Sequence, residues 1–311
     1  MPITDGFSAH SELVRRARIA TLIGMGSSPT PTAFVLSGGA SLGAIQVGML
    51  HALYERGIQP DFIAATSAGA LNGAFIAARP QDVATARELA EIWIGLRRGT
   101  VFPLNPLTGL FGFAGRRGYM VPDSGLRALI ARHLTTPRLE DLPIPLHVVA
   151  TDVLTGAEVR LSDGPLPDAI LASTAIPGVL PNVRWGDRTL MDGGVANNTP
   201  ISHAVEFGAR RIYVLSTGQM CELDVVPRGA LAMFIHATNL LVHRRLVDDI
   251  ERYRDDAELI VLPPPCPIRV QPMDFGHAES LIEGALDESR RFLDVYLTRG
   301  KKSALDGAYR A

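Results

Sequence analysis

A strand, a tight turn and a helix occur twice in succession near the start of the chain, and this repetition constrains the fold most. Ala33–Leu36 is a short apolar run typical of a buried strand, and a glycine-rich turn leads from it into a helix predicted over Ala44–Glu55. A second run, Asp61–Ala65, passes through Ser67 into a helix predicted over Ala68–Ala78. Two such units in a row predict a parallel sheet covered by helices.

The same alternation continues almost to the end of the chain. Further strands are predicted over Leu146–Val153, Ala157–Leu161, Arg211–Ser216 and Glu258–Leu262. Further helices are predicted near Asp82–Leu96, Asp123–His133, Asp168–Thr174, Ala230–Arg254 and Glu279–Leu297. We therefore expect an α/β fold, three-layer α/β/α with a mainly parallel central sheet. One domain over residues 31–300 would follow an N-terminal extension, residues 1–30, and precede a C-terminal tail, residues 301–311.

Charge and cysteine content argue against several classes of protein. The chain has 311 residues, with 30 basic and 32 acidic side chains, and this balance gives no support to phosphate-driven binding of nucleic acid. Only two cysteines occur, Cys221 and Cys266, and neither has metal-ligand spacing. We expect no metal and no cofactor, and a reducing, cytoplasmic compartment is the better interpretation of so few cysteines.

The N-terminal extension resembles a secretory signal only faintly. Three arginines, Arg15, Arg16 and Arg18, precede a short apolar stretch that Thr21 and Gly24 interrupt. We interpret it as a surface helix, with a signal peptide as the alternative. No apolar run approaches the ~18 residues that a membrane-spanning helix needs, so any membrane association is expected to be peripheral.

The turn around Ser67 has the features of a nucleophile elbow. Small residues flank the serine in Ala65-Thr66-Ser67-Ala68-Gly69, which departs from G-x-S-x-G at its first position. The helix that follows offers a free backbone amide at Ala68, which would face an oxyanion forming beside Ser67. The alternative is that Ser67 only caps the helix, a position where serine is favoured.

The glycine-rich turn Gly38-Gly39-Ala40-Ser41-Leu42-Gly43 suits the binding of an anion. Small residues let backbone amides converge, either on a phosphate or on a tetrahedral oxyanion. The dinucleotide pattern fails because Ala40 replaces a glycine and Asp61 begins the next strand instead of ending it. Parallel neighbouring strands would bring this turn and Ser67 to one sheet edge, which favours the oxyanion interpretation.

A third turn, Met191-Asp192-Gly193-Gly194, follows a short apolar strand. A carboxylate projecting from it within hydrogen-bond reach of Ser67 would accept the serine proton as a general base. The alternative is an ordinary turn aspartate, since Asp-Gly sequences are common in turns.

Taken together, these three turns resemble the patatin-like phospholipase family in kind and in order. Two more segments are similar to that family: Ala172–Pro181, which resembles its Ala-Ser-x-Ala-x-Pro stretch, and Asn198-Thr199-Pro200, which follows the aspartate. The resemblance extends over about residues 33–297. It implies a lipid acyl hydrolase with a Ser67–Asp192 dyad, an acyl-serine intermediate, and oxyanion donors on the backbone of Gly38, Gly39 and Ala40.

Two departures from the family pattern bear on function. Ala40 stands where a third glycine is usual, and Leu42 stands where Arg or Lys is common. Losing that charge puts a preference for phosphate headgroups in question and leaves simpler esters open as substrates. A catalytically decayed lipid-binding or scaffold protein and an acyltransferase remain alternatives.

Histidines offer a partner for a Ser-His-Asp triad, but none has a distinctive position. His203, His236, His243 and His277 follow Asp192 along the chain, whereas His51 lies within a predicted helix. A serine so close behind a glycine-rich turn fits a dyad better, and we expect the histidines to be structural or solvated.

Residues 93–120 form the most unusual segment of the sequence. Apolar side chains from Trp93 to Tyr119 lie between two pairs of arginines, with several Gly and Pro among them. An enzyme acting on lipid aggregates needs an apolar, cationic edge near its site, which makes this segment a candidate lid or membrane-contact loop. A loop packed on the core is the equally good alternative.

Overall fold

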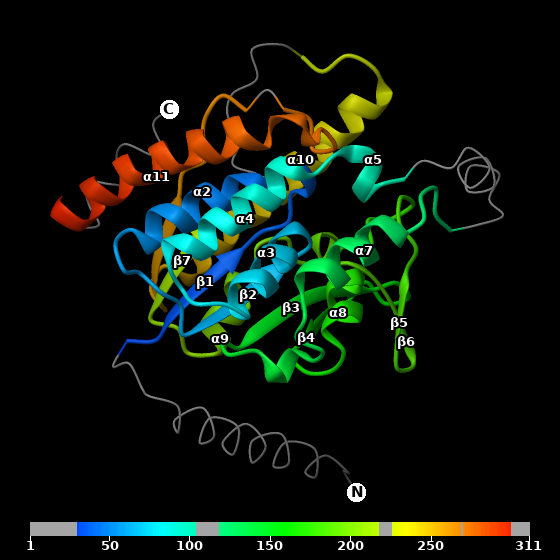
Figure 1. Cartoon of the computed structure of the whole chain (residues 1–311), viewed down its shortest axis with the longest axis horizontal. Helices are drawn as coiled ribbons and strands as arrows, with labels where there is room; N and C mark the ends of the chain where they lie inside the picture. Colours follow the sequence, from blue (N-terminus) through cyan, green and yellow to red (C-terminus); the bar gives the residue numbers. More distant parts are fainter. Residues whose placement is uncertain (1–29, 104–117, 218–225, 269, 300–311) are drawn as a thin grey trace, which may run out of the picture. The chain divides into compact units, whose positions relative to one another are not determined.

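An eight-stranded sheet organises the part of the chain that the structure describes (Figure 1). This computed structural model describes residues 30–103, 118–217, 226–268 and 270–299. The chain divides into two units, Met1–Pro31 and Thr32–Ala311, and everything below concerns the second. The predicted extension, the tail and the lid residues 104–117 lie outside the described residues, so the proposed domain limits stay predictions.

The strands follow the predicted order and are mainly parallel. Their bounds are β1 Thr32–Leu36, β2 Phe62–Thr66, β3 Leu146–Asp152, β4 Glu158–Leu161, β5 Val183–Trp185, β6 Arg188–Asp192, β7 Arg211–Leu215 and β8 Glu258–Leu262. β3, β2, β1, β7 and β8 pair in parallel, whereas β4, β5 and β6 join by antiparallel pairing. This confirms the α/β fold class and its mainly parallel sheet.

Helices cover both faces of the sheet. They are α2 Gly43–Tyr54, α3 Ala68–Ala77, α4 Val83–Gly95, α5 Arg98–Val101, α7 Ser124–His133, α8 Leu166–Ser173, α9 Ile201–Glu206, α10 Ala230–Tyr253 and α11 Ala278–Arg299. Alternate residues of β1 show the layering, because Phe34 and Leu36 belong to the apolar core under α2 and α3. Ala33 and Val35 point the other way, into the core that includes residues of α9 and α10.

The hairpin of β5 and β6 and the short helix α9 are the elements that the sequence predicts least well. Only Thr189–Met191 has the pattern of a strand there, because β5 has three residues and one of them is buried. Short edge strands carry little hydrophobic periodicity, so their pairing is decided by tertiary contacts.

Cys266 differs from the expectation of reduced thiols. Cys266 is disulfide-bonded, and no cysteine within the described ranges is free. The expected reducing compartment therefore has no support from this residue. None of the helices within these ranges is long and apolar enough to cross a membrane.

Candidate functional site

Ser67 lies at a sharp turn between β2 and α3. Its backbone has φ 52° and ψ −122°, outside the regions that L-residues ordinarily occupy. Such conformations persist only where the surroundings enforce them, and they concentrate at functional sites. Gly69 is part of that enforcement, because a Cβ there would lie 2.4 Å from the carbonyl oxygen of Leu36 in β1. The helix can therefore start directly behind the serine, as the elbow pattern predicts.

Ala65, the departure from the elbow pattern, is accommodated by a glycine on the helix. Ala65 is fully buried in β2, and its Cβ lies 3.3 Å from the place where a Cβ on Gly73 of α3 would be. A side chain at residue 73 would crowd the extra methyl, whereas glycine leaves room for it. The departure is therefore compatible with close packing of β2 and α3.

The Ser67 hydroxyl donates a hydrogen bond of 2.7 Å to Oδ2 of Asp192. The other carboxylate oxygen, Oδ1, accepts a 2.7 Å bond from the amide of Gly194, which fixes the carboxylate plane. Gly193, the other glycine of this turn, begins the short 3-10 helix Gly193–Val195 that follows Asp192. Both side chains are almost completely buried, each residue with 7% of its surface exposed. The two residues that the sequence predicted are thus in direct contact.

Strand β3 brings this pair together. β4 pairs with one edge of β3 across Val148–Thr151. β2 and β6 therefore both pair with the opposite edge, β2 with the first part of β3 and β6 with the last part. Thr66, the last residue of β2, pairs with Val149, and Asp192, the last residue of β6, pairs with Ala150. Parallel β2 and antiparallel β6 therefore end against each other, and Ser67, the residue after β2, meets Asp192, the last residue of β6.

Burial sets the electrostatics of the carboxylate. Removal from water raises the pKa of Asp192 from its ordinary 3.8 to about 6, and the hydrogen bonds from Ser67 and Gly194 oppose that rise. A carboxylate with a pKa near the working pH is a better proton acceptor than an ordinary surface aspartate.

The glycine-rich turn lies beside Ser67, as two parallel neighbouring strands require. A Cβ on Gly38 would be only 3.1 Å from Cβ of Ser67. The Gly38 amide donates to the carbonyl of Asn198 over 3.1 Å, so it is already engaged. Among described groups, no hydrogen-bond acceptor is recorded for the amides of Gly39 and Ala40, nor for that of Ala68 at the start of α3.

Thr217 holds the turn in place from the end of β7. Its hydroxyl donates 2.5 Å to the carbonyl of Gly38, and a Cβ on Gly39 would lie 2.1 Å from that hydroxyl oxygen. Ala40 has φ 50°, a left-handed conformation that favours the glycine usual in the family. Gly43 begins α2, and a Cβ at this residue would lie 2.9 Å from the ring of Trp93.

Three supporting residues were not singled out from the sequence as site residues. Oγ of Ser173 accepts from the Ser67 amide over 2.8 Å and donates to Val149 over 2.6 Å. Asn198 donates to the Gly38 carbonyl over 3.4 Å, and Thr217 holds the same carbonyl. Ser173 and Asn198 lie in the two segments that resemble the family, which is the only signal that could have found them.

The histidines do not complete a triad. His203 is bonded to Glu158, His51 pairs with Glu55 at 3.4 Å and His277 pairs with Asp274 at 3.4 Å. His236 lines the cleft beside Ser67, but within the described residues no histidine is recorded as hydrogen-bonded to either member of the pair. The contact between serine and aspartate is therefore direct.

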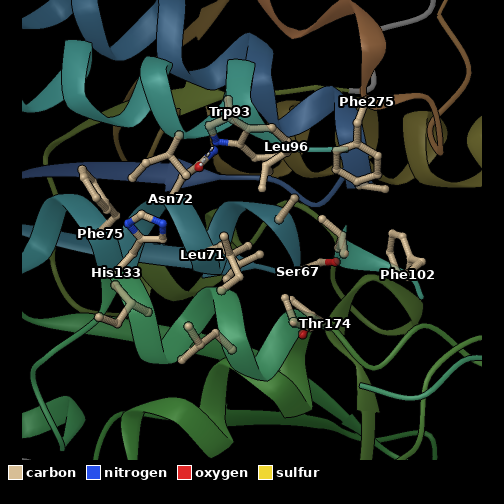
Figure 2. Close-up of a pocket in the computed structure, with 18 of the residues that line it drawn as sticks. Ser67, Leu71, Asn72, Phe75, Trp93, Leu96, Phe102, His133, Thr174 and Phe275 are labelled. Atoms are coloured by element: carbon tan, nitrogen blue, oxygen red, sulfur yellow. Dashed lines mark hydrogen bonds between the residues drawn. The ribbon is translucent and has the colours of Figure 1, made fainter. Parts of the chain in front are cut away.

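Two cavities meet at Ser67. The first is an apolar chamber between α3, α4 and α7, shown in Figure 2. The second is a more polar cleft over Gly39 and Asp192, bounded by α10. Trp93 and Phe102, from the segment expected to contact lipid, are 4% and 5% exposed and line the chamber. These two side chains thus pack inward, whereas Ile94 and Met120 of the same segment are 39% and 43% exposed; residues 104–117 lie outside the described ranges.

The fold and this site together define an α/β protein with a serine–aspartate pair at a strained elbow, beside a glycine-rich turn. A family model described as patatin-like phospholipase matches residues 34–205, more than half of the chain. The chain therefore belongs to the patatin-like phospholipase family.

Curated relatives agree with this family. The chain is 27% identical over 316 residues to patatin-like phospholipase domain-containing protein 7 of Mus musculus, covering 94% of this chain and 22% of that protein. It is 35% identical over 179 residues to an uncharacterized NTE family protein of Mycobacterium tuberculosis, covering 57% of this chain and 46% of that protein. The chain thus spans less than half the length of these relatives. Among solved structures, VipD from Legionella pneumophila matches with a TM-score of 0.45 and 16% identity, covering 86% of this chain and 67% of that one.

Proposed function

We propose that this protein is a lipid acyl hydrolase that cleaves carboxylic esters through an acyl-Ser67 intermediate. The observation that carries the proposal is the 2.7 Å hydrogen bond from the Ser67 hydroxyl to a buried Asp192 carboxylate. A serine hydroxyl is a weak nucleophile until a base is in reach of its proton, and here that base is in contact. Membership of the family supports the same class of substrate.

Acylation begins when Oγ of Ser67 attacks the ester carbonyl and its proton moves to Oδ2 of Asp192. The carbonyl oxygen becomes an oxyanion, which the amides of Gly39, Ala40 and Ala68 are proposed to stabilise. Loss of one such donor typically lowers the rate roughly 10²–10³-fold. The bond from the carbonyl carbon to the alcohol oxygen then breaks, and the alcohol leaves with the proton from Asp192.

Deacylation repeats these steps with water. Asp192 accepts a proton from the attacking water, the ester bond to Oγ of Ser67 breaks, and Oγ recovers the proton. The free acid leaves, and both residues return to their starting states. Acyl transfer would differ only here, with an alcohol in place of water.

The cleft favours alcohols without a strong negative charge. Leu42 lines it where the family commonly has Arg or Lys, and none of its described lining residues is Arg or Lys. A phosphate would therefore find no cationic side chain among them. We accordingly propose that neutral esters are the better substrates.

Steady-state hydrolysis of neutral acyl esters and of phosphatidylcholine tests the proposal. Ser67→Ala and Asp192→Asn are expected to abolish turnover while keeping the circular dichroism spectrum. Two exposed residues serve as matched controls, Ser280→Ala and Asp187→Asn, and both should retain wild-type rates. Full esterase activity in Ser67→Ala would refute the assignment, and release of an acylated alcohol instead of the free acid would indicate acyl transfer.

A further inference from the structure

The apolar chamber follows helix α3 from one end to the other. Ser67 stands at the start of α3, Leu71 is one turn further on, and Phe75 is two turns on; all three line the chamber (Figure 2). α4 contributes residues such as Ile92 and Trp93, and α7 forms the opposite wall with Leu126, Leu129 and Ile130. The chamber is therefore an elongated apolar cavity, and the Ser67 hydroxyl lies at one end of it.

The helix gives the chamber a definite length. Phe75 is eight residues after Ser67, and an α-helix rises ~1.5 Å per residue, so the distance along the axis is about 12 Å. An extended chain of single bonds advances at most ~3.6 Å for every three bonds. About 12 Å thus accommodates roughly ten carbon–carbon bonds.

A cation lies behind Phe75, outside the residues that line the chamber. Arg79 follows the end of α3 by two residues, and its guanidinium lies 3.7 Å from the centroid of the Phe75 ring. It donates to the carbonyls of Phe75 and His133, each over 3.1 Å, and pairs with Glu88 at 3.4 Å. An alkyl chain that passed Phe75 would desolvate this ion pair, which is unfavourable.

The half-buried His133 is the one titratable side chain that lines the described part of the chamber. Burial and the charges of Arg132 and Arg79 lower its pKa, so the imidazole beside Phe75 is neutral near pH 7. A neutral ring tolerates an apolar chain end, whereas the guanidinium behind it does not.

We infer that this chamber binds the acyl chain and limits its length. The protein would then prefer medium-length acyl groups, with roughly eight to ten carbons. The inference rests on the proposed function, because it assigns the acyl half of the ester to the chamber and the alcohol half to the cleft. Phe75 and Arg79 set the limit, and Leu71 lies halfway along the path. Long acyl groups of sixteen or eighteen carbons exceed this length.

Fatty-acid binding to Ser67→Ala tests the chamber without any need for turnover. Calorimetry with saturated fatty acids of four to eighteen carbons should show affinity rising roughly three- to fourfold per added methylene. The rise should stop near ten carbons. Continued gain up to eighteen carbons, or no binding at any length, would overturn the inference.

Two substitutions move the limit in opposite directions. Leu71→Phe, made in the Ser67→Ala protein, should lower the limit to about five carbons, since residue 71 is ~6 Å from the start of the helix. His133→Ala, a milder change at a half-buried residue, should raise the limit by one to three carbons. Ile94→Phe, on the exposed side of α4, is the control and should leave the limit unchanged. An unchanged limit in both chamber variants would contradict the inference.

A parallel ester series with the wild-type protein separates the two proposals. If kcat/KM depends on Ser67 but shows no break near ten carbons, the chamber assignment is wrong and the hydrolase stands. If no ester is hydrolysed while fatty-acid binding shows the break, the hydrolase proposal is wrong and the chamber limit stands.

Discussion

The hydroxyl of Ser67 and the carboxylate of Asp192 are 2.7 Å apart, although 125 positions separate them in the sequence. The contact follows from neighbouring pairs on one strand, Thr66 with Val149 and Asp192 with Ala150. Ser67 begins the turn that follows β2, and Asp192 is the last residue of β6. The pair is therefore held by the centre of the sheet, and its burial governs how it responds to pH.

The rate of hydrolysis should depend on the ionisation of Asp192. Because burial raises the pKa of this carboxyl to about 6, kcat/KM is expected to increase with pH and to level off above that value. A pH–rate profile measured with a neutral ester checks this. A rate that is flat from about pH 4.5 to 8 would contradict the role of Asp192 as base.

The same shift predicts a dependence of stability on pH. The native protein holds the Asp192 proton from 3.8 up to about 6, where the unfolded chain has lost it, so the free energy of unfolding should fall as pH rises through this window. Asp192→Asn does not titrate and should remove this contribution. Urea unfolding at several pH values, compared between the two proteins, measures the difference.

Ser173 should act as a positioning residue. Its Oγ accepts from the Ser67 amide and donates to Val149, so Ser173→Ala removes one hydrogen bond from each of two buried backbone groups. We expect a loss of about 1–3 kcal/mol in stability. Because the Ser67 amide would lose one of the contacts that hold the elbow, kcat should decrease with KM little changed. Ser280→Ala, which removes an exposed hydroxyl bonded to a backbone carbonyl, is the control.

Ala40 tests the conformation of the glycine-rich turn. At φ 50°, glycine should be tolerated without loss of stability, because the relief of strain offsets the greater entropy of the unfolded chain. Valine is β-branched and should destabilise the turn by more than about 1 kcal/mol. Thermal unfolding of Ala40→Gly and Ala40→Val measures both effects. Equal stability in the two variants would show that the turn adopts another conformation.

The sequence predicted the strand–turn–helix units well because their signals are local. Apolar runs and small turn residues marked β1, α2, β2 and α3 within a residue or two. The three turns of the candidate site were found for the same reason. Each combines small residues with at least one polar side chain shortly after or at the end of a strand.

Long-range contacts could not be predicted in the same way. Antiparallel β6 ends against β2 only because β3 is long enough to pair with both, and no local pattern encodes that register. The bond from Ser173 to the Ser67 amide joins residues 106 positions apart. The inward packing of Trp93 and Phe102 depends on a chamber built by three helices, so their hydrophobicity alone could not decide between a lipid-contact loop and a loop packed on the core.

Labelling with a fluorophosphonate probe, followed by mass spectrometry of the peptides, reports on the reactive serine itself. We predict one adduct on the wild-type protein, located at Ser67, and labelling at least about a hundredfold slower in Asp192→Asn, since the base is lost. Absence of any adduct on an actively hydrolysing wild-type protein, or an adduct at a different serine, would contradict the assignment of Ser67 as the nucleophile.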